Sequence, residues 1–311
     1  MSAGESDGTG TGFPFEVAAV WAVFAVVTVV VFVTYGRLPP GDLYHVSGSG
    51  LTGGASRALV YVNYPVALAA IPILILLSQR LPGRLVVVGA VALGIVCSAA
   101  TFWPGVVDQA DLDARPVNAI AAAGVLVAFV LTAVAWRLGR IERHGRLPGD
   151  RARLAVAAVV VVLALPWIAA ELGFSFDGVP VLGTLYQTGE LRSQPHVAGL
   201  HPTVHHGDHH GLSGTLLVLA ALLLSRVLPS IDRRRVRALL GAYLALLLCY
   251  GLGNVANDFW LEQVTKRGWT DWEIPDVSVP KATWAWGIVV LCAAAVWCFS
   301  AWRATRPRGA G

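Results

Sequence analysis

Long apolar stretches alternate with short polar connections along almost the whole chain. A helix needs about 20 apolar residues to cross the roughly 30 Å hydrocarbon core of a bilayer. Eight stretches reach that length, at about residues 15–34, 57–78, 84–103, 117–136, 153–174, 211–229, 236–256 and 283–302. Charged residues, prolines and glycines gather between them, where the backbone can be solvated. The pattern therefore predicts an all-α fold, a polytopic bundle of about eight transmembrane helices.

Composition agrees with this fold class. Apolar residues make up 56% of the 311 residues and charged residues 14%, and the mean hydropathy is +0.64. Soluble domains carry about 25% charged residues, so lipid must cover much of this apolar surface. The first 14 residues contain no Lys or Arg, whereas a signal peptide has a positive n-region. We therefore expect the first apolar stretch to remain as a membrane helix.

The basic residues predict an orientation in the cytoplasmic (inner) membrane. If the connections alternate between two sides, one side carries 16 Lys and Arg and the other carries 7. The positive-inside rule places the richer side in the cytoplasm, which puts both termini there and explains the net charge without nucleic acid. Glu5, Asp7 and Glu16 before the first stretch and Arg37 after it favour the opposite orientation, but the two strongly basic loops outweigh them.

This orientation divides the chain into one transmembrane domain, residues 15–303, between a disordered cytoplasmic tail at 1–14 and a second cytoplasmic tail at 304–311. The extracytoplasmic loops are predicted at 35–57, 104–116, 175–210 and 257–282. The predominance of arginine, with Ala, Val and Gly, suggests a GC-rich bacterial genome. The four cysteines form no CxxC pair and lie in apolar stretches, so we expect them in the core.

One histidine cluster precedes the sixth apolar stretch, on the predicted extracytoplasmic side. Five of the eight histidines fall within ten residues: His201, His205, His206, His209 and His210. Imidazole nitrogen binds Zn, Cu, Ni and Fe. In a helix, His201, His205 and His209 would share one face and His206 and His210 a second, although nearby glycines count against a regular helix. We predict that these five histidines bind a transition metal ion (Zn, Fe or Cu).

Two carboxylates are expected at the same end of the bundle. Glu171 ends the fifth apolar stretch, and Asp258 follows the seventh. Ionisable groups in or beside a membrane core are usually paired or functional, so both are candidate catalytic residues that complete the metal coordination or activate a bound water. The alternatives are that Glu171 is solvated at the interface and that Asp258 caps its helix or pairs with Lys266 or Arg267.

The histidine spacing resembles the histidine boxes of membrane fatty-acid desaturases and hydroxylases, which hold a di-iron centre. The resemblance covers about ten residues. That family distributes its boxes over several cytoplasmic segments, whereas here they overlap in one segment placed outside, so we infer no membership. The alternative is that the histidines bind metal without an evolved role.

Three classes of function remain. The favoured one is a metal-dependent membrane enzyme acting on a lipid-like or cell-envelope substrate, with membrane lipids as its surroundings. The others are a metal-handling protein for transport or sensing, and a scaffold or haem-binding protein. Transport is weakened because the third, fourth, sixth and eighth stretches contain few polar residues. The chain also lacks the H-E-x-x-H, Walker, GxSxG and Rossmann motifs.

Overall fold

The computed structural model describes residues 12–44, 46–103, 113–139, 141–194 and 197–305. Most of the two predicted tails and of the predicted loop at 104–116 lies outside these residues. The helices that follow the apolar stretches are α1 (Phe15–Arg37), α2 (Gly50–Tyr61), α3 (Ala67–Leu77), α4 (Arg84–Ser98), α5 (Asn118–Leu138), α6 (Asp150–Leu163), α7 (Leu165–Glu171), α9 (His210–Leu224), α10 (Arg234–Trp260) and α11 (Trp284–Thr305).

Within the described residues, seven helices are long and apolar enough to cross a membrane, and a bent pair gives up to eight. A π-helical turn at Val62–Val66 joins α2 to α3, and a second at Leu261–Thr265 extends α10. Short 3-10 turns at Ala99–Phe102 and Ser225–Ser230 extend α4 and α9. The mostly helical bundle predicted from the apolar stretches is therefore confirmed.

The bent pair is α6 and α7, which meet at an angle of 57°. Pro166 lies in the first turn of α7, and a proline has no N–H to donate to the carbonyl four residues earlier. That carbonyl belongs to Val162, and it accepts a hydrogen bond of 3.0 Å from the hydroxyl of Tyr186. Tyr186 belongs to the short helix α8 (Leu182–Tyr186). The bend therefore follows from a proline, and the freed carbonyl is satisfied from outside the helix.

Glycines let two central helices approach closely. A methyl group added to Gly214 of α9 would lie 2.6 Å from the carbonyl oxygen of Gly251 on α10, and the reverse distance is the same. Small residues at such contacts allow helix backbones to pack tightly in membranes. By contrast, α4, α5, α6 and α11 carry exposed apolar side chains such as Leu85, Leu126 and Leu291. These are the surfaces that lipid would cover.

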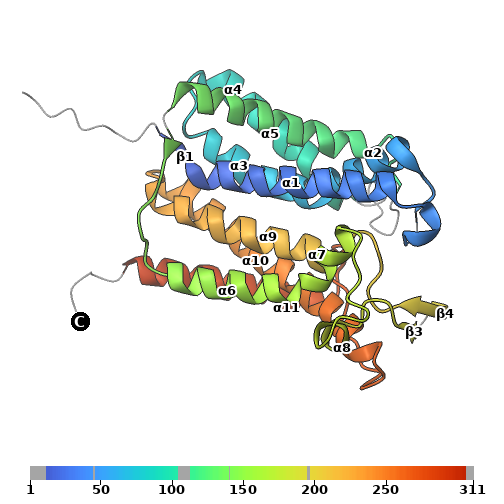
Figure 1. Ribbon diagram of the computed structural model, residues 1–311. Coiled ribbons are helices and arrows are strands. Elements are labelled where there is room, and N and C mark those ends of the chain that lie inside the picture. Colours follow the sequence, from blue (N-terminus) through green and yellow to red (C-terminus); the bar gives the residue numbers. More distant parts are fainter. Residues whose placement is uncertain (1–11, 45, 104–112, 140, 195–196, 306–311) are drawn as a thin grey trace, which may run out of the picture.

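The connections meet at two opposite ends of the bundle (Figure 1). At one end, β1 (Phe13–Pro14) pairs in parallel with β2 (Ile141–Glu142), and Arg226 bonds to Glu16 and Asp150. At the other end, β3 (Leu191–Gln194) and β4 (Val197–Pro202) form an antiparallel hairpin. The same end contains α8 and the short 3-10 turn at Pro40–Asp42. The connections that the sequence pattern assigned to opposite sides of the membrane thus lie at opposite ends of the bundle.

Two helices extend beyond their predicted bounds at the hairpin end. The second begins at Gly50 and the seventh, with its π turn, ends at Thr265, whereas the apolar pattern gave 57 and 256. In α2, Gly53 and Gly54 allow the helix start to lie against the backbone of α1, and this packing keeps a polar segment helical. Arg57 and Asp258 therefore belong to helices and not to loops.

Candidate metal centre

The histidine-rich segment is not a helix. His201 lies in β4, the residues from Thr203 to His209 form an extended connection, and α9 begins at His210. Gly207 has a φ of +129°, which no helix contains, and His206 forms an isolated bridge with Leu43. The segment therefore does not adopt the helical arrangement considered for the cluster, with histidines four residues apart on one face, and the glycines that counted against a regular helix lie at its break and at the start of α9.

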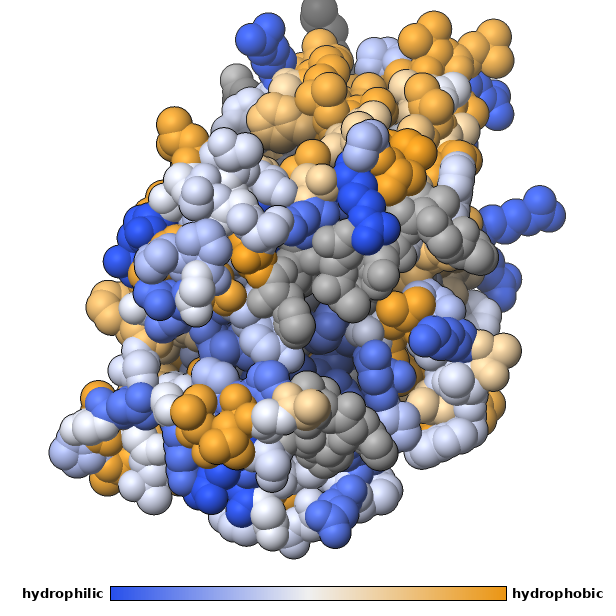
Figure 2. Space-filling model, turned by 90° about the vertical axis from the view of Figure 1, so that its right-hand side faces the viewer, coloured by the Kyte–Doolittle hydropathy of each residue, from blue (hydrophilic) through white to orange (hydrophobic). Residues whose placement is uncertain are grey.

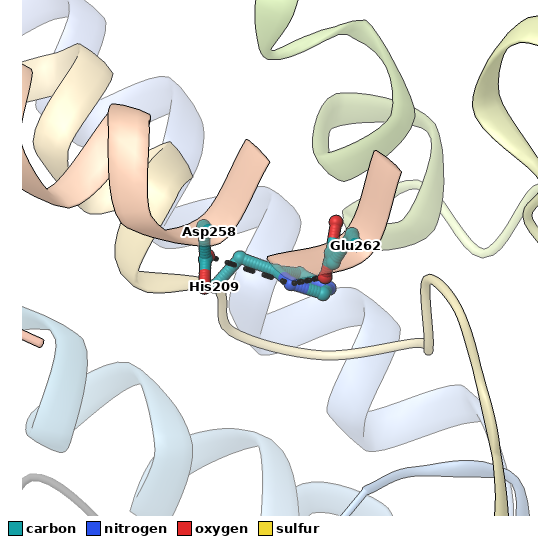
Figure 3. Close-up of side chains that lie close together, drawn as sticks. All are labelled: His209, Asp258 and Glu262. Atoms are coloured by element: carbon teal, nitrogen blue, oxygen red, sulfur yellow. Dashed lines mark ion pairs between the residues drawn. The ribbon is translucent and has the colours of Figure 1, made fainter. Parts of the chain in front are cut away.

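Three side chains meet where this segment reaches α10. The Nδ1 atom of His209 lies 3.2 Å from a carboxylate oxygen of Glu262 and 3.9 Å from one of Asp258. One ligand atom from each residue lies within 4.8 Å of the others, and all three residues are buried. Asp258 and Glu262 are four residues apart, so the end of α10 and its π turn present both toward the histidine. Figure 3 shows this arrangement, which we call the metal centre because its three groups could hold a metal ion.

Each member of the metal centre is held by a hydrogen bond to a residue outside the group. His209 Nε2 is paired with the carbonyl of His205 at 2.9 Å, which leaves Nδ1 facing the carboxylates. Trp167 Nε1 donates to Glu262 at 2.6 Å, and the amide N–H of Gly211 donates to Asp258 at 2.7 Å. Partners of this kind fix the orientation of metal ligands and tune their basicity.

Aromatic rings enclose the imidazole of His209. The ring of His205 stacks on it at 4.3 Å between centroids, and Trp167 lies on it at 6.2 Å with an interplanar angle of 21°. The ring of Tyr44 stacks in turn on His205 at 4.1 Å. This packing excludes rotation of His209 away from the carboxylates.

The metal centre carries more acid than base. Burial alone would lower the pKa of His209, but the carboxylates of Glu262 and Asp258 raise it to about 9. Without a metal the imidazole is therefore protonated at neutral pH and balances one of the two negative charges. A bound metal would displace that proton, because only neutral imidazole can be a ligand. One nitrogen and two carboxylate ligands suit Zn, Fe or Mn better than the soft ion Cu(I).

The other four predicted histidines do not join this group within the described parts of the chain. His201 Nε2 is paired with the carbonyl of Ala198 in its own strand. His206 Nδ1 lies 3.3 Å from the carbonyl of Ala170, and His210 is the half-buried first residue of α9. His205 contributes its carbonyl and its ring face, as described above. Of the five histidines, only His209 has a ligand atom beside both carboxylates.

Glu171 belongs to a second buried cluster near the first. It is 2% exposed, and neither of its carboxylate oxygens accepts a hydrogen bond from a described residue. Arg57, which is fully buried, forms an ion pair with Asp208 and interacts electrostatically with Glu171. The hydroxyl of Tyr35 accepts the backbone N–H of Asp208 at 2.7 Å. Solvation of Glu171 at an interface is therefore not observed.

The alternative partners proposed for Asp258 are engaged elsewhere. Lys266 donates to the carbonyls of Pro202 and Thr203, at 3.4 and 3.2 Å, and so ties the histidine segment to the end of α10. Arg267 donates to carbonyls in α8. Asp258 instead lies 3.9 Å from Nδ1 of His209 and accepts the amide N–H of Gly211.

Sequence reasoning missed Glu262, Trp167 and Arg57. The signal for Glu262 was its position four residues after Asp258, which matters only if the helix continues past its last apolar residue. The chain was also compared with protein-family models, curated proteins and solved structures, and none of them matches it.

The end of the molecule that carries the hairpin is mainly hydrophilic. Figure 2 views this end and shows hydrophilic side chains around a depression near its middle. Arg57, Glu171 and Asp258 of the two buried clusters belong to α2, α7 and α10, which start or finish at this end.

Proposed function

We propose that this protein is a metal-dependent membrane enzyme whose divalent cation is bound by His209, Asp258 and Glu262. The convergence of these three buried ligands, each oriented by a further hydrogen bond, is the observation that supports it. Structural zinc sites use four protein ligands, whereas catalytic sites use three and keep a position for water or substrate. Three ligands thus favour catalysis.

Charge balance also favours a cation. Two buried carboxylates side by side repel each other and are expensive to desolvate. A divalent cation would balance both charges and leave His209 neutral. The competing hypothesis is a structural ion cluster in which protonated His209 bridges the carboxylates, and the raised pKa of His209 favours it in the absence of metal. Metal binding decides between them.

The reaction we propose is attack by a metal-activated water on a lipid-like or cell-envelope substrate. A bound metal lowers the pKa of its water to about 7 in zinc enzymes. Asp258 then acts as a ligand, and Glu171 is the carboxylate that accepts the proton. The support for Glu171 is its complete burial, its lack of a hydrogen-bond donor among described residues, and its electrostatic interaction with His209.

Metal analysis of protein purified in detergent without a histidine tag tests the first part of the proposal. After loading with Zn²⁺, Mn²⁺ or Fe²⁺ and dialysis, we expect one ion per chain in the wild type. The isosteric variants Glu262→Gln and Asp258→Asn should lose it. His201→Ala is the matched control, because the imidazole of His201 is paired with the carbonyl of Ala198 and meets the ring of Tyr44 away from the three ligands, and it should retain the metal.

Retention of an unchanged elution volume and melting temperature would show that the variants are folded. If the wild type holds no stoichiometric metal under any loading condition, the structural ion cluster replaces the enzyme. The catalytic part has a separate test: Glu171→Gln should keep the metal but lose metal-dependent conversion of lipids in reconstituted membranes, followed by mass spectrometry.

A further inference from the structure

A cavity of about 180 Å³ lies away from the metal centre, between α3, α10 and α11. Four aromatic rings line much of its wall: Phe102, Tyr243, Tyr250 and Trp286. Tyr250 stacks on Trp286 at 5.2 Å between centroids and meets Phe102 edge-on at 6.1 Å. These contacts fix three of the four rings relative to one another, so the cavity is built into the packing.

The polar atoms of these aromatic residues donate to backbone carbonyls. Tyr243 donates its hydroxyl to the carbonyl of Leu68 at 2.9 Å, a carbonyl that Pro72 leaves without its helical N–H. Tyr250 donates to the carbonyl of Ser278 at 2.6 Å, and Trp286 Nε1 donates to Val279 at 3.0 Å. The wall consequently exposes only apolar atoms to the cavity.

The cavity belongs to the part of the chain that would lie in the bilayer. Leu68, Phe102, Tyr250 and Trp286 come from four different helices that are long and apolar enough to cross a membrane. In a bilayer the cavity would lie near the ends of these spans, because Phe102 ends one of them and Trp286 lies in the first turn of another, and lipid chains would reach it there. A water molecule here would find no polar partner, and an engineered apolar cavity of about 150 Å³ stays dry and binds benzene. The ligand that fits is hydrocarbon.

We propose that this cavity binds the hydrocarbon chain of a membrane lipid. Its volume admits a flexible chain and is far too small for a helix of a second copy, which is about 10 Å across. The flat aromatic walls provide dispersion contacts on several sides. The cavity and its proposed occupant are independent of the metal, so the inference stands or fails separately from the proposed function.

Tyr250 of the cavity and Asp258 of the metal centre both belong to α10, which gives the distance between the two sites along this helix. Asp258 follows Tyr250 by eight residues, which corresponds to about 12 Å along the helix axis. One leaflet accounts for about half of the roughly 30 Å hydrocarbon core. A lipid whose chain enters the cavity is therefore long enough for its head group to lie at the hairpin end of the bundle.

Photo-crosslinking in vesicles tests this site. The probe is phosphatidylethanolamine with a diazirine on a palmitoyl chain, mixed into phosphatidylethanolamine and phosphatidylglycerol vesicles that contain the full-length protein. We expect crosslinks on the α10 peptide that contains Tyr243 and Tyr250 and on the peptide that contains Trp286. In Leu246→Trp, which adds bulk at the cavity wall, these crosslinks should fall about fivefold, because overpacking opposes entry of the chain.

The matched control is Leu291→Trp, which adds the same side chain at a residue of α11 that is 70% exposed. It should leave the crosslinks at the cavity unchanged. Should Leu246→Trp fail to fold, Leu246→Phe adds less volume and should reduce the crosslinks by a smaller factor. Crosslinks spread equally over all exposed apolar helices, or equal labelling in the filled and control variants, would overturn the proposal.

Discussion

Arg57 and Asp208 form an ion pair next to the metal centre. Arg57 is fully buried in α2 and the side chain of Asp208 is 12% exposed. Asp208 directly precedes His209, and its backbone N–H is bound by Tyr35 of α1. The pair therefore connects the first two helices to the segment that positions His209, and its removal should change both stability and metal binding.

The magnitude follows from the burial of both charges. Removing one partner of a buried ion pair costs about 3–5 kcal/mol, because the other charge is left without compensation. Arg57→Met leaves two carboxylates, Asp208 and Glu171, without their cation, so we expect the free energy of unfolding to fall by about 5 kcal/mol. Asp208→Asn leaves Arg57 with Glu171 as its remaining partner, so we expect the free energy of unfolding to fall by about 3 kcal/mol.

The double variant gives the decisive comparison. With both charges removed, the free energy of unfolding should fall by no more than about 5 kcal/mol, which is at least about 3 kcal/mol less than the sum of the two single losses and so gives a coupling energy of at least about 3 kcal/mol. The assay is reversible unfolding in mixed detergent micelles, with metal affinity as a second readout. We expect each single variant to bind metal about tenfold more weakly, because the ligand His209 loses a positioned neighbour.

An exposed ion pair in the hairpin supplies the control. Arg192 pairs with Glu190, and their side chains are 39% and 43% exposed, so Arg192→Met should change stability by less than about 1 kcal/mol. The reasoning is refuted if Arg57→Met costs as little as this control, or if the two single effects at Arg57 and Asp208 add without coupling.

Three further predictions concern the metal centre and the close contact between α9 and α10. Trp167→Phe removes the N–H that orients Glu262 and should weaken metal binding by about 10–100-fold with little change in fold. In the metal-free protein, protonated His209 contributes to the free energy of unfolding. This contribution is fully present below about pH 6.5 and is lost as the pH rises through about 9. Metal affinity, measured by titration, should rise over the same pH range, because metal binding displaces the proton. Gly251→Ala should destabilise the protein by about 1–3 kcal/mol, whereas Gly287→Ala, which meets no atom within 4 Å, should not.

The sequence by itself determined the membrane-type helical bundle. Each apolar stretch is a local property of the chain, and all eight recur as seven helices and one bent pair. The connections group at two ends because successive long helices run in opposite directions. Asp258 and His209 were also among the predicted site residues, because buried acids and clustered imidazoles are unusual in an apolar chain.

Only the tertiary structure decided which ligands meet. Histidine density predicted a site with five imidazoles, yet strand pairing at His201 and the backbone at Gly207 direct all but His209 elsewhere. Glu262 lies beside His209 because α10 continues through a π turn beyond its apolar part, and Lys266, which follows this turn, donates to carbonyls of the histidine segment. Helix ends and side-chain convergence depend on contacts between distant segments, and these have no signature in local hydrophobic periodicity.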